Sequence, residues 1–338
     1  MTFKVVHSMA VPNMPIEEKI ITDAGAELVK GVFITEDQII EACKDADAVI
    51  GGATAQPITR KVIESLPKCR IFANIGIGYD QLDVQAATDN GMIAANVPDY
   101  CLDEVSDTAM TLLLSLYRKM PIATAMTAEG KLMAMPENTQ KMMPIFRLKG
   151  RVLGLLGLGR IGRAMVPKAQ GFGMKVIAYD PYIPAEAAKE IGVDLVEKDA
   201  LLGQADYLSL HAPAGPDGKP LIGADELAKM KPTAYLINTA RGSLVDEAAL
   251  VAALDAGKLA GAGLDVTAQE PLPTDSPLLG RDNVILTGHS AQISVEATME
   301  LFRRPLVEVA RVLKGEWPVG LINPGVKEKF VAKFGPMK

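Results

Sequence analysis

The stretch Val152–Gly162, VLGLLGLGRIG, decides the fold of this chain. Its first half is a short apolar run typical of a buried strand. Its second half matches G-x-G-x-x-G where a helix is expected to begin, near Arg160. The first glycine permits a tight turn, the second lets the backbone approach a pyrophosphate, and the third lets the helix pack closely on the strand. The stretch therefore predicts a dinucleotide-binding turn at a helix N-terminus, with contacts from Gly157, Leu158, Gly159, Arg160, Ile161 and Gly162.

An acidic residue at the end of the next strand is the second part of this pattern. Asp180 closes the run KVIAYD, about twenty residues after the glycines, where a carboxylate can accept hydrogen bonds from both ribose hydroxyls of NAD. The same carboxylate would repel the 2′-phosphate of NADP, and no arginine follows it directly, so NADH is favoured over NADPH. We expect Tyr179 and Pro181 to line the same site. The alternative is an ordinary strand–turn–helix unit with a solvated aspartate.

The alternation of strands and helices extends outward from this turn. Apolar runs at 207–212, 234–240, 260–266 and 283–288 are further strand candidates, so the stretch from Gly150 to Gly288 is predicted to be a complete doubly wound domain. The first hundred residues alternate in the same way, with strand candidates at 3–8, 46–52, 71–76 and 92–97. This pattern predicts a second α/β domain with a parallel sheet.

Helical segments flank the predicted doubly wound domain. The stretch from Leu102 to Met126 reads as a long helix that Pro121 breaks or kinks, and the segment that follows it has no clear period. Seven of the sixteen methionines lie between Met110 and Met143, which indicates either flexible core filling or an arm that packs on a second subunit. Residues 295–314 read as one amphipathic helix before a tail rich in proline and glycine.

Composition narrows the class of protein. A chain of 338 residues that is 49% hydrophobic and 22% charged is typical of a soluble protein with two domains. A net charge of -6 argues against nucleic-acid and anionic-membrane partners, and no apolar stretch is long enough to cross a bilayer. The start of the chain lacks a signal-peptide pattern. The cysteines show neither metal-ligand spacing nor a disulfide framework, so we expect no metal and a reducing cytoplasm; they are Cys43, Cys69 and Cys101.

Only three histidines can supply an imidazole for proton transfer. His7 ends the first predicted strand and reads as structural, and His211 reads either as a cofactor contact or as a packing residue. His289 follows the predicted strand at 283–288, and the ends of parallel strands are where open α/β sheets bind ligands. Arg241 and Glu270 follow two other strands at the same predicted edge. Each of these residues alone is interpreted as an ordinary polar loop residue. Together they bring a guanidinium, a carboxylate and an imidazole to one edge of the sheet, where they could act in catalysis.

That set suits the reduction of a 2-oxo acid. A guanidinium can hold the substrate carboxylate and carbonyl oxygen with its planar fork. An imidazole, with an ordinary pKa of about 6.5, can give and take a proton at physiological pH. A neighbouring carboxylate orients the ring and favours its charged form. We therefore predict Arg241, Glu270 and His289 as the catalytic residues.

Longer stretches, in order along the chain, resemble the D-isomer-specific 2-hydroxyacid dehydrogenase family. They are NIGIGYDQLDVQAA, LKGRVLGLLGLGRIGRAM, MKPTAYLINTARGSLVDEAALVAALDAGKLAGAGLDV, QEPLP and NVILTGHSA, and the resemblance runs from about Val49 to Pro324. Within the family, LYRK at 116–119 and HSAQIS at 289–294 look more like the branch that contains phosphoglycerate-dehydrogenase-like enzymes and the C-terminal-binding-protein corepressors.

The resemblance implies an architecture. It implies a flavodoxin-like substrate domain made of residues 1–100 and 292–338, and a Rossmann NAD-binding domain at 101–291, with the active site in the cleft between them. It also favours a homodimer joined by the methionine-rich arm at about 120–147. The substrate carboxylate would bind the backbone at Ile77 and Gly78 together with Arg241. Further cofactor contacts would come from His211, Ala212, Pro213, Thr239, Ala240, Asp265 and Ala291, with Asp265 on the nicotinamide amide.

Some positions depart from the family pattern. Many members carry threonine where this chain has Ala109, and Gln292 replaces a frequent aromatic residue near the catalytic histidine, which makes the substrate pocket more polar. Ile77 replaces the lysine of the phosphite-oxidising relative, which argues against phosphite. The expected function is an NAD-dependent dehydrogenase for a small 2-oxo or 2-hydroxy acid. The alternatives are an NAD(H)-sensing, partner-binding protein like the corepressors and a dehydrogenase for another small anion.

Overall fold

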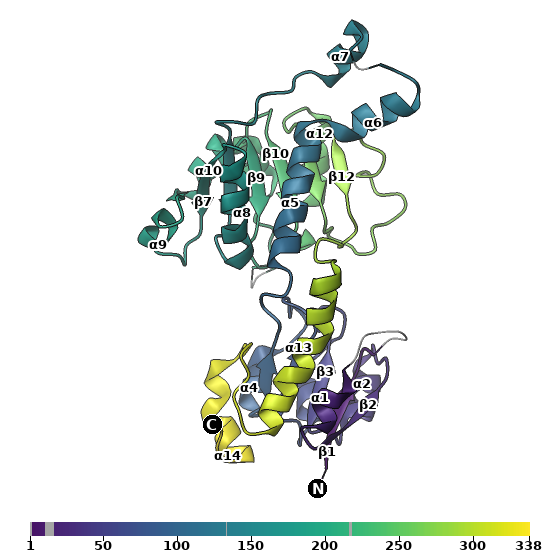
Figure 1. Ribbon diagram of the computed structural model, residues 1–338, viewed down its shortest axis with the longest axis vertical. Coiled ribbons are helices and arrows are strands. Elements are labelled where there is room, and N and C mark those ends of the chain that lie inside the picture. The colour runs from purple at the N-terminus through teal and green to yellow at the C-terminus, as the bar shows by residue number, and fades with distance from the viewer. Residues whose placement is uncertain (1, 11–16, 133, 216–217) are drawn as a thin grey trace. The chain divides into compact units, whose positions relative to one another are not determined.

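The computed structural model describes residues 2–10, 17–132, 134–215 and 218–338, which form two compact units. Unit 1 comprises Met1–Tyr100 and Ser294–Lys338, and unit 2 comprises Cys101–Ile293. Each unit is a parallel sheet with helices on both faces (Figure 1), so the predicted fold class is confirmed. Among the helices in the described part of the chain, none is both long and apolar enough to cross a membrane.

The sheet of unit 1 has five parallel strands in the order β2-β1-β3-β4-β5. This is the flavodoxin-like order. Strands β3, β4 and β5 are buried along their whole length, because helices cover both faces of the sheet. The strands are β1 Phe3–His7, β2 Ala26–Lys30, β3 Ala48–Gly51, β4 Ile71–Asn74 and β5 Ile93–Ala95.

Helices from both ends of the chain cover this sheet. Helix α13, Val295–Leu313, packs Leu306, Val309 and Val312 against buried residues of β1, β3 and β4. The opposite face carries a second apolar cluster that includes residues of α2, α3 and α4. The other elements of unit 1 are α1 Glu18–Thr22, α2 Glu36–Cys43, α3 Arg60–Glu64, α4 Val84–Asp89, η2 Pro324–Val326 and α14 Lys327–Phe334.

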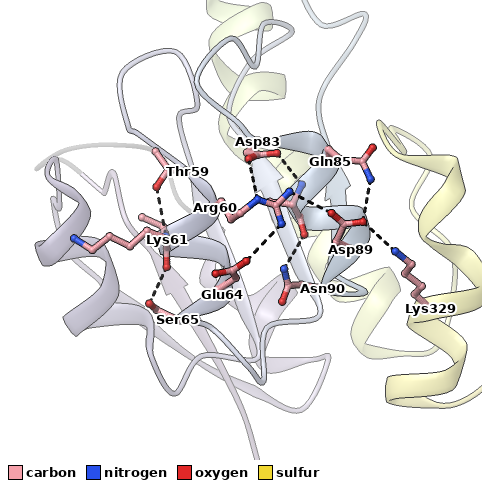
Figure 2. Close-up of polar contacts among 12 residues, drawn as sticks. Thr59, Arg60, Lys61, Glu64, Ser65, Asp83, Gln85, Asp89, Asn90 and Lys329 are labelled. Carbon is pink, nitrogen blue, oxygen red and sulfur yellow. Dashed lines mark hydrogen bonds and ion pairs between the residues drawn. The ribbon is translucent and has the colours of Figure 1, made fainter.

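Helix α14 lies in the tail that the sequence analysis described only as rich in proline and glycine. Phe330 on this helix is buried, and its ring lies 5.7 Å from that of Trp317. Lys329 pairs with Asp89 of α4 at 3.0 Å, and Asp89 also accepts from Arg60 of α3 (Figure 2). The hydrogen bond from Lys329 is the main reason that the pKa of Asp89 is lowered. Contacts with distant parts of the chain therefore hold this helix.

The sheet of unit 2 has seven parallel strands in the order β12-β11-β10-β9-β6-β7-β8. Strand β6 pairs with both β7 and β9, so the strand order reverses between β6 and β9. Such a reversal is where open α/β sheets bind their ligands. The strands are β6 Val152–Leu156, β7 Lys175–Tyr179, β8 Asp194–Leu195, β9 Tyr207–Leu210, β10 Tyr235–Asn238, β11 Gly261–Leu264 and β12 Val284–Leu286.

Two apolar clusters enclose this sheet. One joins helices α5 and α8 to the strands, and the other includes residues of α10, α11 and α12. The helices of unit 2 are α5 Leu102–Tyr117, α8 Arg160–Gly171, α9 Ala185–Lys189, α10 Lys198–Gln204, α11 Ala224–Lys229, η1 Gly242–Leu244 and α12 Glu247–Asp255.

The segment after α5 projects from the body of unit 2 (Figure 1). The helical segment expected from Leu102 to Met126 is broken near Pro121, as the sequence predicted, and α5 ends at Tyr117. Lys119 then takes a left-handed conformation with φ of 51°, and α6, Met120–Ala128, begins with Pro121 in its first turn. Because proline lacks the N–H group that a helix interior needs, the break falls before it. Helix α7, Pro136–Met142, forms where the sequence showed no period.

Candidate active site

The predicted site residues of unit 2 follow the carboxyl ends of its strands, which all lie at one edge because the sheet is parallel. Along the sheet this edge runs from His289 and Ala291 after β12, through Asp265 after β11, to Thr239–Arg241 after β10. It continues with His211, Ala212 and Pro213 after β9, the glycine turn Gly157–Gly162 after β6, and Tyr179, Asp180 and Pro181 at the end of β7.

The three glycines of the turn meet different surroundings. A Cβ atom on Gly157 would lie 2.7 Å from the carbonyl carbon of His211, so the turn contacts the end of β9. A Cβ atom on Gly162 would lie 2.4 Å from the carbonyl oxygen of Gly157. A Cβ atom on Gly159 would meet no atom of the described residues within 4 Å, apart from its chain neighbours. The first and third glycines therefore permit close backbone packing, and the second leaves open space beside the start of α8.

The carboxylate of Asp180 is hydrogen-bonded to the glycine turn. Its Oδ2 atom accepts a hydrogen bond from the Leu158 N–H at 2.8 Å, and its Oδ1 atom accepts from the Tyr182 N–H at 2.9 Å. A carboxylate oxygen has a further lone pair beyond each of these bonds. The carboxylate can therefore still accept hydrogen bonds from ribose hydroxyls.

This edge fits a dinucleotide. The hydroxyl of Thr239 is buried and has no hydrogen-bond partner among the described residues. Helix α8 begins at Arg160 with no side chain capping its first N–H groups, beside the open space at Gly159. Unpaired donors at a helix N-terminus attract phosphate groups, and a buried hydroxyl favours a polar partner.

Asn238, which the sequence analysis did not single out, shapes the turn that carries Arg241. Its Nδ2 atom donates to the Arg241 carbonyl oxygen at 2.8 Å, and its Oδ1 atom accepts from the Ala240 N–H at 3.0 Å. The next residue, Gly242, passes so close to the loop after β11 that a Cβ atom would lie 1.9 Å from the Thr267 carbonyl oxygen. Only glycine permits this approach, which brings the Arg241 turn beside the loop of Glu270.

Glu270 and His289 are in contact. The Oε2 atom of Glu270 lies 2.7 Å from Nδ1 of His289, and both side chains are partly exposed, at 39% and 44%. The Oε1 atom of Glu270 accepts from the Thr267 N–H at 3.2 Å. Because Nδ1 faces the carboxylate, Nε2 is the ring nitrogen left to meet a substrate. Gln292 donates to the His289 carbonyl oxygen at 3.1 Å.

Asp265 holds the backbone on both sides of His289. Its carboxylate accepts from the hydroxyl of Thr287 at 2.6 Å, from the Ser290 N–H at 2.9 Å and from the Ala291 N–H at 3.1 Å. His289 itself has φ of 57°, a left-handed conformation that is uncommon outside glycine. The buried carboxylate therefore stabilises the strained turn that presents the imidazole. Its expected contact with the nicotinamide amide stays a prediction.

The other two histidines are buried. Burial lowers the pKa of His7 and that of His211 to about 4 in each case, so both rings stay neutral at physiological pH. Nε2 of His211 lies 2.9 Å from the hydroxyl of Ser209. Neither ring suits proton exchange with a substrate, so the geometry favours His289.

Ile77 and Gly78 belong to unit 1 and lie in the loop after β4. Their carbonyl oxygens accept hydrogen bonds from Asn96 and Asn74. The sequence analysis did not single out these two asparagines. A polar residue directly after a buried apolar strand is the signal that could have found them, and the same signal applies to Asn238.

The chain matches known proteins over most of its length. Residues 110–291 match the model of the family "D-isomer specific 2-hydroxyacid dehydrogenase, NAD binding domain". A glyoxylate reductase of Korarchaeum cryptofilum is 40% identical over 85% of this chain and 86% of that protein. The chain belongs to this family.

Two further comparisons extend the family assignment. A D-3-phosphoglycerate dehydrogenase of Methanocaldococcus jannaschii is 38% identical over 94% of this chain, but the chain spans only 59% of that relative's length. The crystal structure of a glyoxylate reductase from Paecilomyes thermophila superposes with a TM-score of 0.84 at 27% identity, over 95% of this chain and 98% of that one. The family predicted from the sequence stretches is thus confirmed, and it is a family of NAD-binding oxidoreductases.

Proposed function

We propose that this protein is an NAD-dependent 2-oxo acid reductase that interconverts a small 2-oxo acid and its D-2-hydroxy acid. The observation that carries the proposal is the 2.7 Å contact between Glu270 and His289, at the same sheet edge as Arg241 and the glycine turn. When bound, NAD(H) supplies or accepts the hydride. The relatives carry the names of dehydrogenases and reductases, which favours an enzyme over an NAD-sensing, partner-binding protein.

Each residue of the catalytic set has a distinct task. Arg241 binds the substrate carboxylate and polarises the carbonyl group with its planar guanidinium. His289, charged and oriented by Glu270, gives its Nε2 proton to the carbonyl oxygen during reduction and takes a proton back during oxidation. In unit 1, the peptide N–H groups of Ile77 and Gly78 also bind the carboxylate.

The cofactor preference is for NADH. The carboxylate of Asp180 is held at the end of β7 by the N–H groups of Leu158 and Tyr182, where a ribose 2′-phosphate would meet a fixed negative charge. The pyrophosphate would lie beside Gly159 at the start of α8. The remaining predicted contacts, from His211 to Ala291 along the edge, would surround the nicotinamide and adenosine.

The carboxyl edge of unit 1 favours a substrate without a phosphate group. The loops after β2, β3, β4 and β5, at residues 31–35, 52–59, 75–83 and 96–101, contain no lysine or arginine. They do contain Asp80, Asp83 and Asp99, and Arg304 of α13 pairs with Asp99 at 2.5 Å. Because a phosphate dianion is bound in proteins mainly by arginine, lysine or several N–H donors, this edge suits a single carboxylate.

The test is NADH oxidation by the purified protein with a panel of 2-oxo acids. The panel contains glyoxylate, pyruvate, oxaloacetate, hydroxypyruvate and 3-phosphohydroxypyruvate; the last two differ only in the phosphate. We expect turnover of short unphosphorylated acids, faster with NADH than with NADPH. His289→Ala should lower kcat at least about 100-fold, the usual contribution of general acid catalysis. Tight NADH binding without turnover of any acid would contradict the proposal.

We also propose a homodimer in the cytoplasm. The segment around α6 and α7 exposes large apolar side chains, which soluble proteins usually cover with a partner. Cys43, Cys69 and Cys101 are buried, and Cys43 and Cys69 are free thiols, which fits a reducing compartment.

A further inference from the structure

The loop after β4 presents three successive carbonyl groups to buried asparagine side chains. Asn74, the last residue of β4, donates from Nδ2 to the carbonyl oxygens of Gly76 at 3.0 Å and Gly78 at 2.8 Å. Asn96, just after β5, donates from Nδ2 to the carbonyl oxygen of Ile77 at 2.7 Å. Asn74 is 1% exposed and Asn96 is 9% exposed. The two asparagines therefore fix the orientation of three consecutive peptide planes.

The N–H groups of those peptides point the opposite way. In a trans peptide the N–H lies opposite the preceding carbonyl, and the cis bonds of the described chain lie elsewhere, before Pro144 and Pro271. The N–H groups of Ile77, Gly78 and Tyr79 thus face away from the asparagines. Within unit 1, as far as the structure describes it, none of the three donates a hydrogen bond. Successive outward N–H groups form a concavity that binds anions.

Further contacts hold the asparagines themselves. The Oδ1 atom of Asn74 accepts from the Ala53 N–H at 2.7 Å, so its amide is bonded on both sides. The backbone N–H of Asn96 donates to the Gly320 carbonyl oxygen at 2.9 Å, and a Cβ atom on Gly320 would lie 2.0 Å from the Asn96 carbonyl oxygen. The buried carboxylate of Glu308, on α13, accepts from the N–H of the residue before Gly320 at 2.8 Å. The C-terminal segment of unit 1 therefore supports the loop.

We propose that Asn74 and Asn96 are positioning residues for substrate binding, which orient the N–H groups of residues 77–79 toward the carboxylate of the 2-oxo acid. The inference rests on the proposed function and names the side chains on which its carboxylate site depends. Neither asparagine needs to touch the substrate, because each acts through the peptide plane whose carbonyl oxygen it holds.

The test replaces each asparagine by aspartate, which has the same size but substitutes an oxygen for the Nδ2 donor. That oxygen repels the loop carbonyls, so the peptide planes are expected to turn. Asn323→Asp is the matched control. Asn323 is 3% exposed in the same unit, accepts from the Ala94 N–H at 2.9 Å and donates to the Met92 carbonyl oxygen at 3.0 Å, away from the loop.

We expect Asn74→Asp and Asn96→Asp to raise KM for the 2-oxo acid at least ten-fold, with a smaller change in kcat and an unchanged Kd for NADH. A carboxylate contact serves the ground state and the transition state alike, so its loss appears mainly in KM. Asn323→Asp should show a similar loss of thermal stability with the KM of the unchanged protein. Equal KM values in all three variants would overturn the inference.

A second measurement separates this inference from the proposed function. Oxamate carries a carboxylate next to a carbonyl group and is not reduced, so it can be titrated into the NADH-loaded protein while the amide signals of Ile77, Gly78 and Tyr79 are followed by NMR. We expect these signals to shift, and we expect the shifts to require higher oxamate concentrations in Asn74→Asp and Asn96→Asp. Turnover without such shifts would overturn the inference alone. Shifts in a protein that reduces no 2-oxo acid would support carboxylate binding by the N–H groups of residues 77–79. They would contradict the proposed function.

Discussion

Two glutamates accept hydrogen bonds from N–H groups of the loop after β11, and one of the two also contacts the imidazole of His289. Glu270 lies 2.7 Å from His289, whereas Glu247 of α12 accepts from the Ala268 N–H at 2.5 Å. Both carboxylates are bonded to this loop, but only Glu270 has a histidine ring as a further partner. They therefore offer a matched pair for testing what a carboxylate beside the imidazole of His289 does.

Glu270→Gln should lower kcat for reduction of the 2-oxo acid by about five- to ten-fold, because a hydrogen bond to a charged carboxylate is stronger than one to an amide oxygen by roughly 1 kcal/mol. The carboxylate of Glu270 contacts Nδ1 of His289 at 2.7 Å and so orients Nε2, and the amide should hold the ring less firmly. The measurement is kcat for the 2-oxo acid at saturating NADH. Glu247→Gln should keep the kcat of the unchanged protein, and an unchanged kcat in Glu270→Gln would remove Glu270 from this role.

At the scale of elements, the turn between β6 and α8 combines close packing with open space. Gly162 needs its missing side chain because the carbonyl oxygen of Gly157 occupies that position, 2.4 Å from an added Cβ. Gly159 has φ of -69° and no atom within 4 Å of an added Cβ. The close packing of the turn therefore needs glycine at position 162, and the proposed phosphate site needs the open space at Gly159.

A methyl group at each glycine should separate these two requirements. Gly162→Ala forces a backbone overlap and should destabilise unit 2 by about 1–3 kcal/mol, the usual range for overpacking. Gly159→Ala should melt near the temperature of the unchanged protein but bind NADH at least about ten-fold more weakly, because the methyl group enters the pyrophosphate space. Thermal melts and NADH fluorescence titrations measure the two effects. A Gly159→Ala variant as unstable as Gly162→Ala would refute this division.

At the scale of the whole molecule, several of the exposed large apolar side chains of unit 2 lie on the segment that carries α6 and α7. Leu132 is 65% exposed, Met143 is 55% exposed and Met135 is 46% exposed. Apolar side chains of this size, close together along one projecting segment, are typical of a surface that a partner covers. A second copy of the chain is the proposed partner.

Replacing Leu132 and Met143 together by serine should convert the dimer to a monomer. Light scattering after size-exclusion chromatography should give about 72 kDa for the unchanged protein, twice the 36.0 kDa of one chain, and about half of that for the variant. Phe172→Ser is the control, since Phe172 is 49% exposed in the same unit but follows α8. A monomeric unchanged protein, or a variant that stays dimeric, would count against the arm.

The amino-acid sequence by itself determined the features that repeat locally. Strands buried on both faces are mostly apolar, so β3, β4, β6 and β9 stand out in the sequence, and polar residues at or after the ends of such strands mark the candidate site. The sequence analysis did not predict the edge strands β2 and β8. A strand paired on one side needs fewer apolar residues, and β2 and β8 read only AELVK and DL.

Only the tertiary structure decided the features that depend on residues far apart in the chain. Helix α14 is held in place because Lys329 pairs with Asp89 and the ring of Phe330 lies beside that of Trp317, contacts that the sequence analysis did not predict. The loop at 76–78 is fixed by Asn74 and Asn96, one of them from a separate strand end. Hydrogen bonds and close approaches of this kind depend on where the backbone passes in space, which no local pattern of residue types encodes.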